Sequence, residues 1–188
     1  MTWSAAAVAR LAAIGVLGGI LQLTTVSQVA FFGVPADLTP LLVAAVGLLC
    51  GSIAGASFGF GLGLFMDTLL AQTLGLTSLV LLAAGYAAGR LRELRDPAHA
   101  LVPVAVGAAA TAVAAIGFSI LQFLLGVDAP VSWLLIRQIL LVILLNTLLA
   151  MPVYLVCRRV LGPFLPDDPR RRRRRAYTTG GLSPLSRA

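Results

Sequence analysis

Asp67 and Arg137 are charged residues set within long apolar stretches of this 188-residue sequence. Ionisable groups are costly inside a lipid bilayer, so each needs a partner, water or a functional purpose. Asp67 lies five residues before the end of the apolar segment 53–72, and Arg137 lies six residues after the start of the segment 131–157. We predict an ion pair between two helices. In the alternative interpretation, Arg137 reaches the headgroups while Asp67 caps a helix or faces water.

Residues suited to catalysis or metal binding are scarce. His99 is the only histidine and sits beside Asp96 and Pro97, so no second imidazole can complete a metal site. No serine or cysteine is paired with a base by a recognisable pattern. Cys50 and Cys157 fall at ends that we assign to the reducing cytoplasm. The sequence therefore predicts no enzymatic activity, no cofactor, no metal site and no disulfide.

The elements that carry these residues are long, apolar and separated by short charged segments. The chain is 59% hydrophobic and 11% charged, whereas soluble domains carry roughly 25% charged residues. A membrane-spanning helix needs about 20 apolar residues. Six segments qualify, which makes the chain an all-α integral membrane protein: Val8–Phe32, Ala36–Gly51, Ile53–Gln72, Leu74–Leu91, Leu101–Gly126 and Val131–Cys157. Because the second is short, a re-entrant pair over 36–66, leaving four full spans, is the alternative.

The orientation follows from the arginines, because the chain has no lysine. Apart from Arg137, arginines occur at residue 10, in the segment 90–95, in the segment 158–175 and at residue 187, and they are missing from the segments 33–39, 71–73 and 126–130. Positively charged loops stay in the cytoplasm. We therefore predict a six-transmembrane-helix bundle with the N-terminus and the C-terminus both inside.

The chain divides into a polytopic membrane domain, residues 1–165, and a polar tail, residues 166–188. The tail cannot build a hydrophobic core, so we expect a disordered cytoplasmic segment. Its consecutive arginines should be attracted to anionic lipids, or should serve simply as an orientation signal, rather than bind nucleic acid. These residues are Arg170, Arg171, Arg172, Arg173, Arg174 and Arg175.

Small and polar residues mark the expected helix contacts. Glycines recur every four residues from Gly47 to Gly63, and the step is repeated in the fourth segment. Such spacing lets helix backbones approach closely in a membrane. We expect packing, or a partner interface, at Gly55, Gly59, Gly63, Gly85 and Gly89. Other polar residues should form hydrogen bonds between helices or line a cavity: Gln22, Thr24, Thr25, Ser27, Gln28, Gln138 and Asn146.

These motifs together resemble the rod shape-determining protein MreD family. The Pro35-Ala36-Asp37-Leu38 segment is similar to the family's Pro-Asp-Leu approach to its second span, with one extra alanine. The glycines of the third segment that end in Asp67 resemble the family's third span, and Gly85-Tyr86 with Gly89-Arg90 resembles the end of its fourth. The likeness covers about residues 20–92.

The resemblance implies a non-enzymatic scaffold in the inner (plasma) membrane of a bacterium, within the cell-wall elongation complex. The expected partners are an MreC-like bitopic protein, RodA with a class B penicillin-binding protein, and, at least indirectly, the MreB filament. The resemblance also implies a fold similar to that of the substrate-binding subunits of energy-coupling-factor transporters. A substrate-binding membrane subunit of a vitamin transporter is therefore the alternative function.

Overall fold

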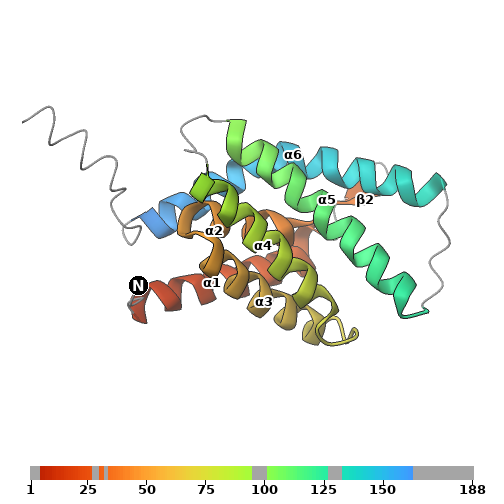
Figure 1. Cartoon of the computed structure of the whole chain (residues 1–188), viewed down its shortest axis with the longest axis horizontal. Helices are drawn as coiled ribbons and strands as arrows, with labels where there is room; N and C mark the ends of the chain where they lie inside the picture. The colour runs from red at the N-terminus through yellow and green to blue at the C-terminus, as the bar shows by residue number, and fades with distance from the viewer. Residues whose placement is uncertain (1–4, 27–29, 32–33, 95–100, 127–132, 163–188) are drawn as a thin grey trace, which may run out of the picture.

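The structure, a computed structural model, describes residues 5–26, 30–31, 34–94, 101–126 and 133–162. Within these segments the chain forms six α-helices, one short wide-turn helical segment and a two-stranded hairpin (Figure 1). The elements in chain order are α1 (Ala5–Leu21), η1 (Gln22–Val26), β1 (Ala30–Phe31), β2 (Val34–Pro35), α2 (Leu38–Cys50), α3 (Ser52–Leu69), α4 (Leu76–Leu94), α5 (Leu101–Leu124) and α6 (Trp133–Leu161).

Four of the helical stretches in the described segments are long and apolar enough to cross a membrane: Ala5–Thr24, α3, α5 and α6. The apolar helix α2 has 13 residues. At 1.5 Å per residue it is about 20 Å long, which is shorter than the roughly 30 Å hydrocarbon core. The structure thus bears out an all-helical membrane protein, while the count of six crossings stays a prediction.

The helix α2 forms the centre of the bundle. All of its residues except Leu42 and Cys50 are buried. One face packs against α4 and α5 through Ala44 and Leu48, and another packs against the end of α6 through Val46 and Leu49. Because neighbouring helices surround it, α2 is apolar on every side, as expected for a helix with no solvent-facing stripe.

The helices α3 and α4 form a hairpin whose backbones touch along the glycines. A Cβ atom placed on Gly55 would lie 2.4 Å from the carbonyl oxygen of Gly85. In the same way, a Cβ atom placed on Gly85 would lie 2.2 Å from the carbonyl oxygen of Gly55. A Cβ on Gly63 would lie 2.4 Å from the Cα of Ser78. These distances are shorter than any van der Waals contact, so larger residues would force the two helices apart.

The bundle has one arginine-rich end, formed by the starts of α1, α3 and α5 and by the ends of α2, α4 and α6 (Figure 1). Arg10 donates a hydrogen bond to the carbonyl oxygen of Val160, which ties α1 to the end of α6. Of the six arginines in the described segments, five lie at this end, whereas Arg137 lies near the opposite end.

The first apolar segment is helical over a shorter range than the predicted Val8–Phe32. Regular α-helix ends at Leu21, η1 continues to Val26, and the chain then forms the hairpin in which Ala30 pairs with Pro35. The physical reason is that the polar residue Gln22 bonds to the returning chain just beyond this hairpin. A continuous helix to Phe32 would carry the chain away from these contacts.

Candidate functional site

Two side-chain amides hold the short extended segment that leads into α2. Gln22 donates from Nε2 to the carbonyl oxygen of Ala36 (3.1 Å) and accepts at Oε1 from the amide of Leu38 (2.8 Å). Asn146 of α6 donates from Nδ2 to the carbonyl oxygen of Asp37 (2.7 Å) and accepts at Oδ1 from the amide of Asp37 (3.1 Å). We call this arrangement the amide clamp.

The clamp replaces the hydrogen bonds that a neighbouring strand would supply. Backbone groups in a membrane cannot be left unpaired, because each one costs several kcal/mol in hydrocarbon. The second amide hydrogen of Asn146 goes to Thr111 Oγ1 (3.0 Å), which in turn donates to the carbonyl oxygen of Gly107 (2.9 Å). Asn146 is fully buried, so α5, α6 and the start of α2 are fixed together at one point.

Asp37 is the N-cap of α2. Its carboxylate accepts a hydrogen bond from the amide of Thr39 (2.9 Å), which satisfies one of the free donors at a helix start. The negative charge also sits favourably at the positive end of the helix dipole. The segment Pro35 to Leu38 therefore starts the helix α2 and places the Asp37 carboxylate at its N-terminus.

A cavity of about 330 Å³ lies above the start of α2, on the side away from the arginine-rich end. It forms there because α2 is shorter than α5 and α6, so its first turn lies below their ends. The polar residues around it are Gln22, Asp37, Thr39, Gln72, Thr77 and Thr111, and its apolar wall includes Leu70, Val80, Phe118 and Val142. We call it the polar cavity. All six α-helices or the segments next to them contribute to it.

Asp67 serves the turn between α3 and α4. Its carboxylate accepts from the amide of Gly75 (2.8 Å) and from the amide of Thr77 (3.3 Å), and the residue is fully buried. Arg137 is exposed on α6, and Arg90–Glu93 is the salt bridge found in the described segments. The structure does not bring Asp67 and Arg137 together. Two backbone amides donate to the carboxylate where the sequence predicted a cation.

At the arginine-rich end, Glu93 of α4 caps α3. The residue before α3 is Gly51, which has no side chain to offer, and Glu93 Oε1 accepts from the amide (3.1 Å) and the hydroxyl (2.6 Å) of Ser52. Glu93 also pairs with Arg90 (3.0 Å). The bonds from Ser52, followed by those from Arg90, lower the pKa of the Glu93 carboxyl below its ordinary value of 4.5.

The glycines expected at a helix-packing or partner surface pack against other helices of the protein. Gly55, Gly59 and Gly63 are buried, and their nearest neighbours belong to α4 and α2. Of the two expectations the structure shows helix packing, and the same small surface cannot contact α4 and a partner together. The other face of α3 is the one that stays accessible.

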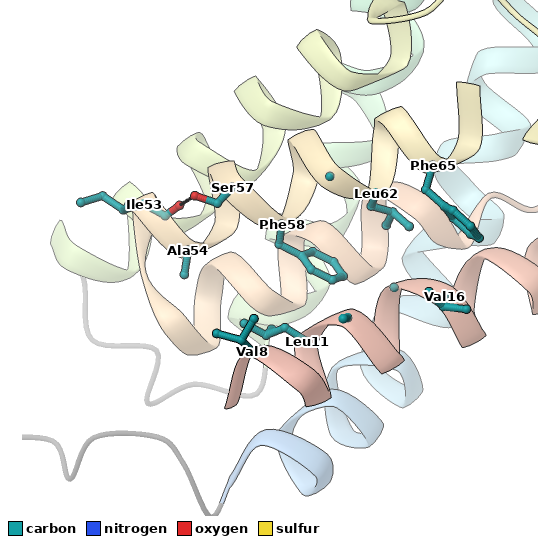
Figure 2. Close-up of a pocket in the computed structure, with 12 residues that line it drawn as sticks. Val8, Leu11, Val16, Ile53, Ala54, Ser57, Phe58, Leu62 and Phe65 are labelled. Atoms are coloured by element: carbon teal, nitrogen blue, oxygen red, sulfur yellow. Dashed lines mark hydrogen bonds between the residues drawn. The ribbon is translucent and has the colours of Figure 1, made fainter. Parts of the chain in front are cut away.

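That accessible face of α3 forms an apolar groove with α1, about 550 Å³ in volume (Figure 2). Phe58 and Phe65 extend from α3 toward α1. Between the larger side chains lie small residues, and a Cβ atom added at Gly61 would meet nothing within 4 Å. We call this feature the α1–α3 groove. Its lining is Val8, Leu11, Ala12, Gly15, Val16, Ile53, Ala54, Ser57, Phe58, Gly61, Leu62 and Phe65.

Comparison with protein families places these features in context. The family model described as rod shape-determining protein MreD matches residues 9–160, which is most of the chain. The chain belongs to the MreD family. Comparisons with curated proteins and with solved structures found no match. MreD membership indicates a role in rod shape determination, and it favours that role over vitamin transport.

The MreD match covers the amide clamp, the polar cavity and every residue that lines the α1–α3 groove except Val8. It ends before the run of arginines at residues 170–175, which lies outside the described residues, as does His99. Within the described segments, no group of three or more His, Cys, Asp or Glu residues is placed to hold a metal ion. Cys50 and Cys157 are free thiols.

Sequence reasoning on this MreD-family chain identified Gln22 and Asn146 as polar groups for helix contacts but missed their common target. That target is the backbone of residues 36–38. The available signal was the Pro35 to Leu38 motif, because a proline followed by an N-cap residue indicates an extended segment that needs partners for its backbone. No sequence signal indicated that the partners would be two side-chain amides.

Proposed function

We propose that this chain is a non-enzymatic membrane scaffold of a bacterial cell-wall elongation complex. In this role it binds an MreC-like bitopic protein and positions RodA and a class B penicillin-binding protein, and its link to the MreB filament is indirect. The observation that carries the proposal is the match of residues 9–160 to the MreD family. Apolar helices without a metal-binding cluster in the described segments are compatible with a binding role.

The proposed location is the inner membrane, with six crossings and both ends in the cytoplasm. The alternating direction of the six helices and the arginines at one end support this orientation, because positive charge is retained on the cytoplasmic side (Figure 1). The short α2 then crosses together with the extended segment before it. The arginine tail is proposed to bind anionic lipid. The similarity in fold to energy-coupling-factor subunits remains a prediction.

The surface proposed for the MreC-like partner is the α1–α3 groove. On α1 the lining runs from Val8 to Val16 and on α3 from Ile53 to Phe65, which corresponds to roughly 12 and 18 Å of helix. A groove of this length accommodates about three turns of a transmembrane helix. Helices associate in lipid where small residues permit close backbone approach, and Gly61 offers such a place.

The experiment that tests the function has a genetic and a biochemical part. Depletion of the protein should convert rod-shaped or polar growth to rounded cells without affecting the uptake of any vitamin. The tagged protein, purified from native membranes in mild detergent, should retain the MreC-like partner at a fixed ratio. Normal cell shape after complete depletion would contradict the proposal, and so would a vitamin bound to the purified protein together with an uptake defect.

A further inference from the structure

The polar cavity contains a carboxylate that no cationic side chain of the described segments pairs with. Asp37 is partly buried at the base of this cavity, and within the described segments its carboxylate accepts hydrogen bonds from Thr39, while its backbone bonds to Asn146. No arginine of the described segments lies within ion-pair distance of it, since Arg90–Glu93 is the pair that they form. A carboxylate can accept about four hydrogen bonds, so Asp37 has capacity for a further donor.

The surroundings of this carboxylate specify what kind of donor would fit. Hydroxyl and carboxamide groups lie near Asp37, whereas Leu70, Val80, Phe118 and Val142 line the wall. A ligand for such a site combines a cationic head with an apolar stem. Lysine and arginine side chains have this construction, because their methylene stems pack on apolar surface while the charged head seeks polar groups.

The size of the cavity favours a side chain over a free metabolite. Small-molecule sites enclose about 300–1,000 Å³, and this cavity of about 330 Å³ lies at the lower limit. Its position at the end opposite the arginines makes it accessible from the cell exterior in the proposed topology. Charge also agrees, since five of the six described arginines lie at the other end, whereas this end has the carboxylates of Asp37 and Asp67 and one arginine, Arg137.

We propose that the polar cavity receives a lysine or arginine side chain from an extracytoplasmic segment of a protein partner, and that Asp37 pairs with its cationic head. The inference deepens the scaffold function and rests on it, because it names the chemistry by which a partner is recognised. Asp37 thus has two tasks: it caps α2 through Thr39 and it offers the remaining capacity of its carboxylate to the partner. Thr77 and Gln72 line the same cavity.

A substitution can separate the two tasks. Asparagine caps helices about as well as aspartate, so Asp37→Asn should preserve the fold while it removes the charge. Gln72 is exposed at the rim of the cavity, so Gln72→Arg should repel the basic side chain and Gln72→Glu should attract it. Size-exclusion profile and thermal unfolding in detergent verify that each variant is folded.

The direct test is photocrosslinking in living cells. A benzoylphenylalanine at position 70 lies in the cavity wall, and one at position 69 is the matched control: Leu69 and Leu70 are 47% and 46% exposed, but only Leu70 lines the cavity. We expect a protein adduct at position 70 whose cross-linked peptide contains a lysine or arginine. The adduct should fall at least about tenfold with Asp37→Asn or Gln72→Arg, the loss expected for removing one member of a charge pair.

Three results would overturn the proposal: equal adducts at positions 69 and 70, an adduct that is unchanged by Asp37→Asn, or a cross-linked peptide without a basic residue. A purified-protein arm uses n-butylguanidinium as the probe and n-butanol as its neutral control. The guanidinium should raise the melting temperature of the wild type and not that of Asp37→Asn. Equal effects on both proteins would contradict the assigned role of Asp37.

The design keeps this inference distinct from the scaffold function. If Asp37→Asn cells stay rod-shaped and retain the adduct while depletion still produces rounded cells, then the cavity proposal fails and the scaffold function stands. If depletion leaves cell shape unchanged, the scaffold function fails whatever the cross-links show. If n-butylguanidinium raises the melting temperature but no protein adduct forms at position 70, the cavity binds a free amine. That result would overturn the proposal that the basic group comes from a protein partner.

Discussion

The carboxamide of Asn146 bonds to both backbone groups of Asp37, a residue 109 positions earlier in the chain. In this way α6 holds the segment that starts α2, and Gln22 holds the same segment from the other side. Because α2 is surrounded by the other helices, the clamp sets the depth at which the central helix begins. It also determines where the Asp37 carboxylate lies in the polar cavity.

Asn146→Ala should destabilise the protein by about 1–3 kcal/mol, because the amide and carbonyl of Asp37 would lose their partner in a buried site. Unfolding in mixed micelles would measure the difference. Gln138→Ala is the matched control, since Gln138 lies on the same helix and is exposed. Equal stability of the two variants would show that the clamp does not hold the fold.

Gly55→Ala should weaken the α3–α4 hairpin by about 1–3 kcal/mol or more, because the added methyl group would overlap the carbonyl oxygen of Gly85. Gly61→Ala on the same helix is the control, since a Cβ there meets nothing within 4 Å. It should be neutral or slightly stabilising, as alanine favours helix over glycine. Comparable loss in both variants would contradict the glycine seam.

Asp67→Asn and Arg137→Ala should act independently. Asp67→Asn removes the charge of a carboxylate that accepts hydrogen bonds from two backbone amides, so it should reduce stability. Arg137→Ala alters an exposed residue, and its effect on stability should not depend on Asp67. In a double-mutant cycle the coupling energy should be within about 0.5 kcal/mol of zero. A coupling well above that value would restore the ion pair predicted from the sequence.

The cap that Glu93 places on α3 should depend on pH. The folded-state pKa of Glu93 is lowered, so the stabilisation is present above the unfolded pKa and is lost as the pH falls through the folded value. The wild type should therefore exceed Glu93→Gln in melting temperature at pH 7, and the difference should shrink as the pH drops below 4.5. A difference that is constant from pH 7 to acid would exclude a contribution from the charge.

Gly61→Leu should block the α1–α3 groove without affecting the fold, because a Cβ atom at this position meets nothing within 4 Å and the longer side chain extends into the groove. We expect the MreC-like partner to be lost from the purified complex by at least about tenfold, with the melting temperature of the isolated protein preserved. Ala87→Leu, at an exposed position on α4 outside the groove, should retain the partner. Loss in both variants would indicate a general effect of bulk on the lipid-facing surface.

The sequence by itself determined the class of protein and the limits of most helices. Long apolar stretches are unstable in water, so the segments Ile53–Gln72, Leu74–Leu91 and Leu101–Gly126 could be recognised from composition, and α3, α4 and α5 follow them closely. The four-residue glycine spacing likewise indicated a face of α3 with no side chains, because a helix returns to the same face at that interval.

The tertiary structure alone decided which groups meet. Depth along a helix is readable from residue counts, but the direction in which Asp67 and Arg137 point depends on how each helix is rotated against its neighbours. In the structure Asp67 turns to the α3–α4 turn and Arg137 faces outward. The clamp on residues 36–38 and the polar cavity depend in the same way on the short α2 lying between longer helices, a relation that no local sequence pattern encodes.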